Sequence, residues 1–78
     1  MKNVQSVLFQ KNLNTKRDAE TFLRKHNFII NRATPNFDTT HFYRYRQFDP
    51  DENKYTYRMY LVNPSKNIYF VLEYPREY

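Results

Sequence analysis

Short runs of β-branched and aromatic residues alternate with polar segments along this chain. The runs predict strands at residues 4–9, 28–31, 41–48, 55–62 and 68–74. Polar or Pro-containing stretches at residues 33–39, 49–53 and 64–67 are typical of loops and turns. We therefore expect one small α+β domain over residues 1–78, in which a single helix packs on a mainly antiparallel four- to five-stranded sheet.

The helix is predicted over residues 16–26. Thr15 and Asp18 have the spacing of a capping box, in which each side chain accepts a hydrogen bond from the other residue's backbone N–H. The chain has no Gly, so Asn27 is expected to end the helix in the left-handed conformation. Apolar or weakly polar positions recur at the spacing of one helical face: Ala19, Phe22, Leu23 and His26.

The register of the last two strands is predicted from the loop between them. Pro64 suits a type I turn and Asn67 a left-handed residue, so residues 64–67 form a hairpin loop that pairs Asn63 with Ile68. If Phe48 pairs with Lys54, residues 41–48 and 55–62 form a second hairpin. The inward-facing residues of this arrangement are Tyr43, Tyr45, Tyr57, Met59, Leu61, Phe70, Leu72 and Tyr74.

The opposite face of that predicted sheet combines aromatic rings with arginines. Rings can stack on unpaired bases while arginines hold phosphates. Tyr and Arg are also enriched at protein interfaces, and both are common on solvated strands, where Arg58 would simply face Glu73. The candidate binding residues are Phe42, Arg44, Arg46, Arg58, Tyr60 and Tyr69, with Thr56 between them.

Composition supports a folded domain with an aromatic core. The 78 residues include 13 Lys or Arg and 8 Asp or Glu, for a formal charge of +5. The mean hydropathy of −0.99 would suit a disordered chain, but eight Tyr and seven Phe can bury large areas. The chain has no Cys, and it has neither a long apolar run nor a signal-peptide pattern near its start. We expect no disulfide, no membrane contact and no secretion.

The residues that could support catalysis have simpler structural interpretations. His26 continues the apolar face of the helix, and no nucleophile motif accompanies His41. Asp49, Asp51 and Glu52 could bind Mg²⁺ at a nuclease-like site, but they are also typical of a solvated turn. We therefore expect no catalytic residue, no metal site and no cofactor, and we interpret the chain as a non-enzyme.

Three segments form a longer pattern. Residues 4–9 read VQSVLF, residues 19–26 read AETFLRKH and residues 42–50 read FYRYRQFDP. In this order they resemble a small domain that recurs in phages and large DNA viruses, sometimes inside or beside phage head-assembly proteins. Phe22 stands where the family has Trp, and Asn27 where it has Gly. The second half also lacks glycines expected from the family.

The resemblance implies a viral origin and a compact α+β fold. We expect a non-enzymatic viral binding module, a minor virion or capsid-assembly component that docks on other virion proteins. It would be located in the virion or inside the host cell, in the cytoplasm or nucleus. The alternative is a protein that binds single-stranded DNA or RNA through the basic-aromatic sheet face. Salt dependence would separate the two, because phosphate binding weakens steeply with salt.

Overall fold

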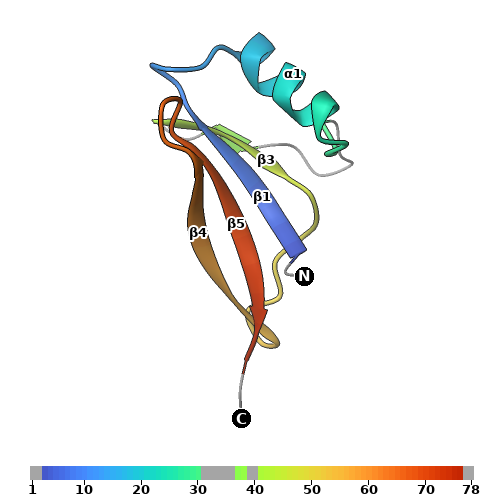
Figure 1. Ribbon diagram of the computed structural model, residues 1–78. Helices are drawn as coiled ribbons and strands as arrows, with labels where there is room; N and C mark the ends of the chain where they lie inside the picture. Colours follow the sequence, from blue (N-terminus) through green and yellow to red (C-terminus); the bar gives the residue numbers. More distant parts are fainter. Residues whose placement is uncertain (1–2, 31–36, 39–40, 77–78) are drawn as a thin grey trace.

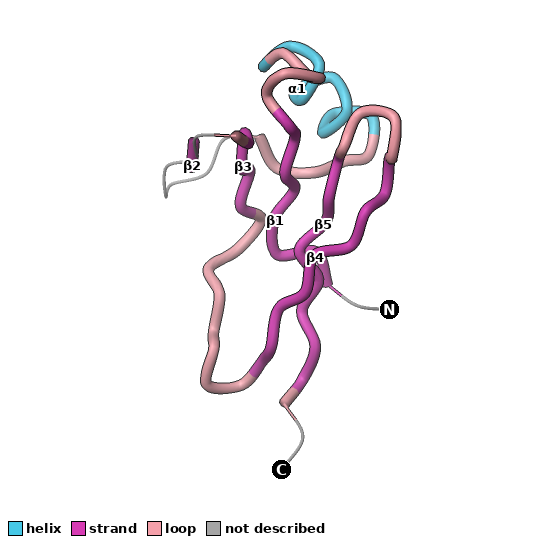
Figure 2. The backbone as a smooth tube through the Cα atoms, turned by 90° about the vertical axis from the view of Figure 1, so that its left-hand side faces the viewer, coloured by secondary structure: helices cyan, strands magenta, loops and turns pink. Residues whose placement is uncertain are grey.

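The computed structural model describes residues 3–30, 37–38 and 41–76 (Figure 1). Its elements in chain order are β1 (Asn3–Gln10), α1 (Lys16–Lys25), β2 (Phe37–Asp38), β3 (Phe42–Arg46), β4 (Tyr55–Asn63) and β5 (Ile68–Pro75). The strands form one sheet in the order β2-β3-β1-β5-β4, and every pairing in it is antiparallel. This arrangement confirms the predicted α+β fold. The helix covers one end of the sheet and leaves the far ends of β4 and β5 uncovered (Figures 1 and 2).

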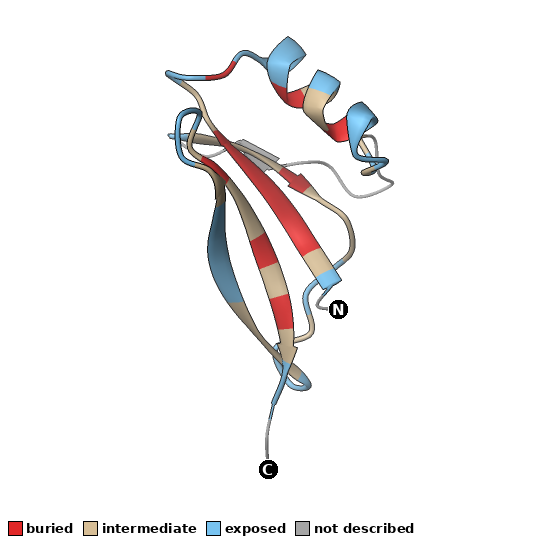
Figure 3. Cartoon of the chain, in the orientation of Figure 1, coloured by how far each residue is buried: buried red, intermediate tan, exposed pale blue. Residues whose placement is uncertain are grey.

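The first strand of the chain is the middle strand of the sheet. Leu8 of β1 lies opposite Arg44 of β3 on one side and opposite Tyr69 of β5 on the other. Five consecutive residues, 5–9, are buried, and they form the red stretch of β1 in Figure 3. Residues on both faces of β1 are therefore shielded from solvent.

The core between α1 and the sheet is built around Phe9. Its ring makes edge-to-face contacts with Phe22 of α1 at 5.5 Å and with Tyr45 of β3 at 5.8 Å between ring centroids. Such aromatic pairs add attraction beyond the area they bury. Rings thus supply much of the core, as the composition predicts. The buried residues of this cluster are Val7, Phe9, Ala19, Leu23, Tyr45 and Ile68.

Local signals for the helix and its ends are confirmed. Thr15 and Asp18 form the complete capping box. Asn27 has φ of 61° and Asn67 has φ of 47°, so Asn takes the left-handed positions in this chain without Gly. The inward orientation predicted for Tyr43 and Tyr45 is also confirmed, since they lie opposite Phe9 and Val7.

The prediction of a strand at residues 28–31 is wrong for residues 28–30, which the structure describes. Residues 28–30 form no strand, and Asn31 lies outside the described residues. Side chains hold this segment instead. Phe28 packs on Phe70 with ring centroids 5.4 Å apart. The Ile29 backbone N–H donates to the Gln47 side-chain oxygen, and the Gln47 side-chain NH2 donates to the Ile29 carbonyl. The short strand β2 forms at residues 37–38, inside the segment predicted as a loop, and the rest of that predicted loop lies outside the description.

The predicted hairpin between residues 41–48 and 55–62 is also wrong. β3 pairs with β1 and β2, whereas β4 pairs with β5. Two strands, β1 and β5, therefore separate β3 from β4, and neither Phe48 with Lys54 nor Arg44 with Arg58 forms a cross-strand pair. Sequential strands are usually neighbours in a sheet, but here the central place belongs to the first strand.

The register of β4 on β5 changes after its first pair. Asn63 lies opposite Ile68 as predicted, but the register shifts between Leu61 and Asn63, so Leu61 faces Tyr69 instead of Phe70. A bulge of one extra residue reverses the faces of all the residues beyond it. Met59 and Leu61 consequently lie away from the helix, which contradicts their predicted inward orientation.

Replacing Asp18 by Asn tests the capping box. The backbone N–H of Thr15 donates to the Asp18 carboxylate at 3.0 Å, and this bond lowers the pKa of Asp18. Because the pKa is lower in the folded than in the unfolded chain, the carboxylate stabilises the fold above about pH 3.9, and this contribution is lost as the pH falls through the lowered value. We expect Asp18→Asn to be less stable than the wild type in urea at neutral pH and equally stable at strongly acidic pH. A loss of the same size at every pH would contradict this role, and Glu52→Gln in an exposed loop is the charge-matched control.

Candidate binding surface

The face of the sheet away from α1, called here the outer face, carries four of the six predicted binding residues. Side chains alternate along β1, so Ser6 and Leu8 point away from the helix that Val7 and Phe9 contact. Cross-strand partners share a face, and Arg46 lies opposite Ser6. By the same rule the outer face includes Phe42, Arg44, Arg46 and Tyr69, which we call the basic-aromatic patch.

The rings of this patch meet across β1. Phe42 of β3 and Tyr69 of β5 pack edge to face with centroids 5.9 Å apart. The two strands are not neighbours, so the rings bridge over the intervening β1. Two guanidinium groups, those of Arg44 and Arg46, follow Phe42 along β3 on the same face. The outer face thus presents rings and cations side by side, although on different strands from those predicted.

Arg44 is held by buried polar groups of β1. Its Nε donates to the Ser6 hydroxyl at 3.2 Å, and its Nη2 donates to Gln5 Oε1 at 3.1 Å. Gln5 and Ser6 are only 1% and 0% exposed. The Gln5 amide in turn donates to the Phe48 carbonyl at 2.7 Å. The Arg44 guanidinium therefore satisfies acceptors that would otherwise be buried without a cationic partner.

The register shift between Val4 and Ser6 of β1 explains why this network was not predicted. A bulge of this kind places an additional residue, Gln5, between two regular pairs, beside Ser6 and within reach of Arg44. Partial burial lowers the pKa of Arg44, and the neighbouring charge of Arg46 lowers it further. Two adjacent, partly desolvated guanidiniums make this part of β3 a favourable place for an anionic group.

Arg58 and Tyr60 do not join the patch. They lie opposite Leu72 and Phe70 of β5, and Phe70 contacts the helix residue Phe22. Both therefore lie on the helix side of the sheet. The Arg58 guanidinium carbon lies 5.6 Å from the centre of the Tyr74 ring. The bulge near Leu61 is the physical reason why the six predicted residues are divided between two faces.

The edge strand β4 is the most exposed apolar element. Among the described residues only β5 pairs with it. Four consecutive residues, 58–61, are exposed, and Met59, Tyr60 and Leu61 retain 54%, 59% and 42% of their accessible surface (Figure 3). An edge strand also presents backbone N–H and C=O groups without ladder partners. The sequence prediction missed this surface because it placed residues 55–62 between two other strands.

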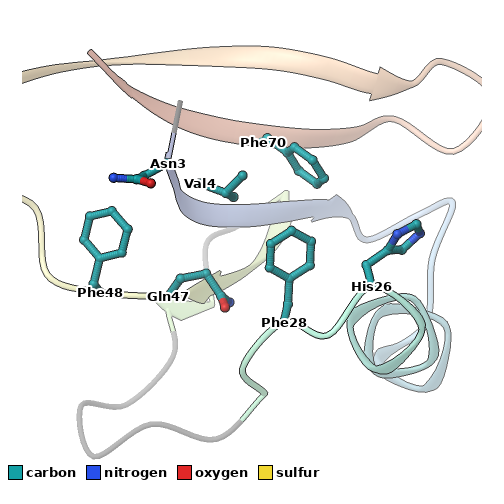
Figure 4. A pocket seen from close by; sticks show the side chains of 7 residues that line it. All are labelled: Asn3, Val4, His26, Phe28, Gln47, Phe48 and Phe70. Atoms are coloured by element: carbon teal, nitrogen blue, oxygen red, sulfur yellow. The ribbon is translucent and has the colours of Figure 1, made fainter. Parts of the chain in front are cut away.

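An open apolar groove lies on the helix side near the start of β1 (Figure 4). His26 stands at its rim and packs on Phe22 with ring centroids 4.4 Å apart. None of the described residues that line the groove is acidic, so they offer His26 no carboxylate for a proton-transfer pair. The lining residues are Asn3, Val4, His26, Phe28, Gln47, Phe48 and Phe70.

The acidic turn after β3 is held by internal hydrogen bonds. Asp51 Oδ1 accepts from the Asn53 backbone N–H at 3.1 Å, and the Asp51 N–H donates to the Tyr57 hydroxyl at 2.7 Å. Desolvation raises the pKa of Tyr57. The described residues contain no group of three or more His, Asp or Glu side chains placed to hold a metal ion. The described helix, α1, is not long and apolar enough to cross a membrane.

No protein-family model, no curated protein and no solved structure matches this chain in the comparisons made. Besides the apolar groove, the described residues offer a ligand the basic-aromatic patch on the outer face and the apolar edge of β4.

Replacing Arg44 by Met tests its structural role. Removal of the guanidinium takes away the donors that Arg44 gives to Ser6 Oγ and Gln5 Oε1, while the Ser6 hydroxyl still donates to Gln5 Oε1. We expect a cost of about 1.5–3 kcal/mol in the free energy of unfolding, which is typical of hydrogen bonds to a charged group. Arg17→Met on the exposed surface of α1 is the matched control and should cost far less. Urea unfolding followed by circular dichroism gives both values, and equal values would contradict the role assigned to Arg44.

Proposed function

We propose that this protein is a non-enzymatic viral binding module, a minor virion or capsid-assembly component that docks on other virion proteins. The observation that carries the proposal is the edge of β4, where four exposed residues follow one another along an open strand. The resemblance of residues 4–9, 19–26 and 42–50 to the phage and large-virus domain supports the viral origin.

Docking at this edge would use strand addition. An extended segment of a partner forms backbone hydrogen bonds with the open edge, and its alternate side chains contact those of β4. Met59 and Leu61 offer apolar contacts on the outer side, and Tyr60 offers a ring on the helix side. Aromatic residues, Met and Arg are enriched at protein interfaces, and three of these types occur at residues 58–60.

The distribution of arginines favours protein docking over nucleic-acid binding. Arg44 already donates hydrogen bonds from Nε and Nη2 to Ser6 and Gln5. Arg58 lies on the other face of the sheet, against the Tyr74 ring. The arginines therefore do not form the continuous basic surface for a phosphate backbone that the sequence pattern predicts. The side chains of the β4 edge, in contrast, are more exposed than predicted.

Site-specific photo-crosslinking tests the docking proposal. A crosslinking amino acid at position 59 should label a virion protein in infected cells, whereas the same group at the exposed helix position Thr21 should not. The labelled protein, prepared separately, should bind the wild type and lose at least about tenfold in affinity for Met59→Lys. Thr21→Lys adds the same charge away from β4 and should bind normally. The proposal fails if the chain is absent from purified particles and binds no virion protein.

Single-stranded nucleic acid is the second candidate ligand, favoured by the contact of Phe42 with Tyr69 beside two guanidiniums. A base stacked on Tyr69 would contribute roughly 1–3 kcal/mol. We expect Arg46→Gln to reduce the slope of log affinity against log salt by about one for a single-stranded oligonucleotide. Arg58→Gln removes the same charge from the opposite face and should leave the slope unchanged. No binding to single-stranded DNA or RNA at low salt would exclude this candidate.

A further inference from the structure

In an antiparallel pair, alternate residues of a strand direct their N–H and C=O groups toward the partner strand and the others direct them away. The hydrogen bonds between β4 and β5 therefore show which residues of β4 direct these groups toward its open edge. The Arg76 N–H donates to the Lys54 carbonyl at 2.9 Å, so residues 54, 56, 58 and 60 direct their backbone groups toward β5. On the other side of β5, the Gln10 N–H donates to the Asn67 carbonyl at 3.3 Å, which gives the same alternation. Residues 57, 59 and 61 therefore direct their N–H and C=O groups outward.

These outward groups match a second copy of the same strand. We infer that β4 pairs with β4 of another copy, antiparallel and centred on Met59, so that Tyr57 of each copy lies opposite Leu61 of the other. The three outward-directed residues then face one another, as a ladder requires. The inference goes beyond the proposed function, because it places a second copy of this chain, instead of another virion protein, at the β4 edge.

Side chains fit this register on both faces. On the helix side, Arg58 of each copy lies opposite Tyr60 of the other, and a guanidinium next to a ring gains a cation–π contact. On the outer side, Met59, Leu61 and Tyr57 of the two copies form one continuous apolar stripe. Each of the three large apolar side chains exposed on β4 thus gains neighbours from the other copy, Met59 and Leu61 on the outer side and Tyr60 on the helix side.

Neighbouring symmetric registers fit less well. Centring the pair on Arg58 would place two arginines directly opposite each other, and like charges in that position destabilise a sheet. A pair centred between Arg58 and Met59 would place outward-directed groups opposite groups that already bond β5. A two-fold interface uses the same patch on both copies, so the pattern of residues 57–61 supplies both halves of the contact.

Net charge makes a distinctive contribution to this contact. Each copy carries a formal charge of +5, so the two copies repel each other at low salt. Added salt screens that repulsion and should tighten the dimer. Binding to nucleic acid or to an acidic protein would show the opposite dependence.

Cysteine crosslinking tests the register, because the chain has no Cys of its own. Residues 58 and 60 of the two copies form a non-hydrogen-bonded pair, with Cα atoms about 4.5 Å apart, within the range that a disulfide bridges. A mixture of Arg58→Cys and Tyr60→Cys should therefore oxidise to the mixed dimer in preference to either pure dimer. Thr21→Cys on α1 should form no disulfide-linked dimer. Equal crosslinking of all variants, or none, overturns the inference.

Sedimentation equilibrium of the purified full chain provides the second measurement. The wild type should dimerise more tightly as salt rises, Met59→Lys should weaken the dimer at least about tenfold, and Thr21→Lys should not. Circular dichroism checks that each variant is folded. A wild type that stays monomeric at its highest soluble concentration overturns self-pairing. If the wild type is monomeric and Met59→Lys still fails to bind a virion protein that the wild type binds, the docking proposal holds and self-pairing fails. If the wild type dimerises through β4 but is absent from particles and binds no virion protein, self-pairing holds and the docking proposal fails.

Discussion

The insertion of β1 between β3 and β5 is the constraint on which the rest of this structure depends. Hydrogen bonds on both sides of β1 join the two halves of the sheet, and its Val7 and Phe9 side chains build the core with α1. Because β1 takes the central place, β4 is left at an edge and β3 lies near the other end. The exposed apolar strand and the basic-aromatic patch are both consequences of this one arrangement.

The buried positions on the outer face of β1 and β5 are partly polar. Gln5 and Ser6 rely on Arg44, and the buried Glu73 accepts a hydrogen bond from the Tyr57 hydroxyl at 3.1 Å. Such networks are stable only when their members find partners, because a buried polar group without one is costly. Residue types typical of a ligand site therefore serve, in part, to complete the sheet.

Local structure was predictable from the sequence, and strand order was not. The helix, its capping box and the left-handed Asn27 and Asn67 depend on a few neighbouring residues, and all of them were predicted. The central place of β1 depends on pairing between residues 32 to 70 positions apart, which no local pattern encodes. The bulges near Gln5 and Val62 add one residue each, and a prediction by alternation alone then assigns the wrong face to the residues beyond them. For the candidate site, Phe42, Arg44, Arg46 and Tyr69 were placed together correctly, whereas Arg58 and Tyr60 were not.

The two ends of the described sheet differ in how they could recruit another strand. β2 has two residues, too few to template a long partner. β4 has nine residues, and between Tyr55 and Asn63 its sequence contains no Pro or Lys and a single charge, Arg58. Soluble proteins commonly protect such an edge with charges, Pro or a bulge, and here the bulge lies near one end and leaves residues 57–61 regular. An edge that is long, apolar and only partly protected presents backbone groups that another strand can pair with, so the two ends of the described sheet differ in their capacity for strand addition.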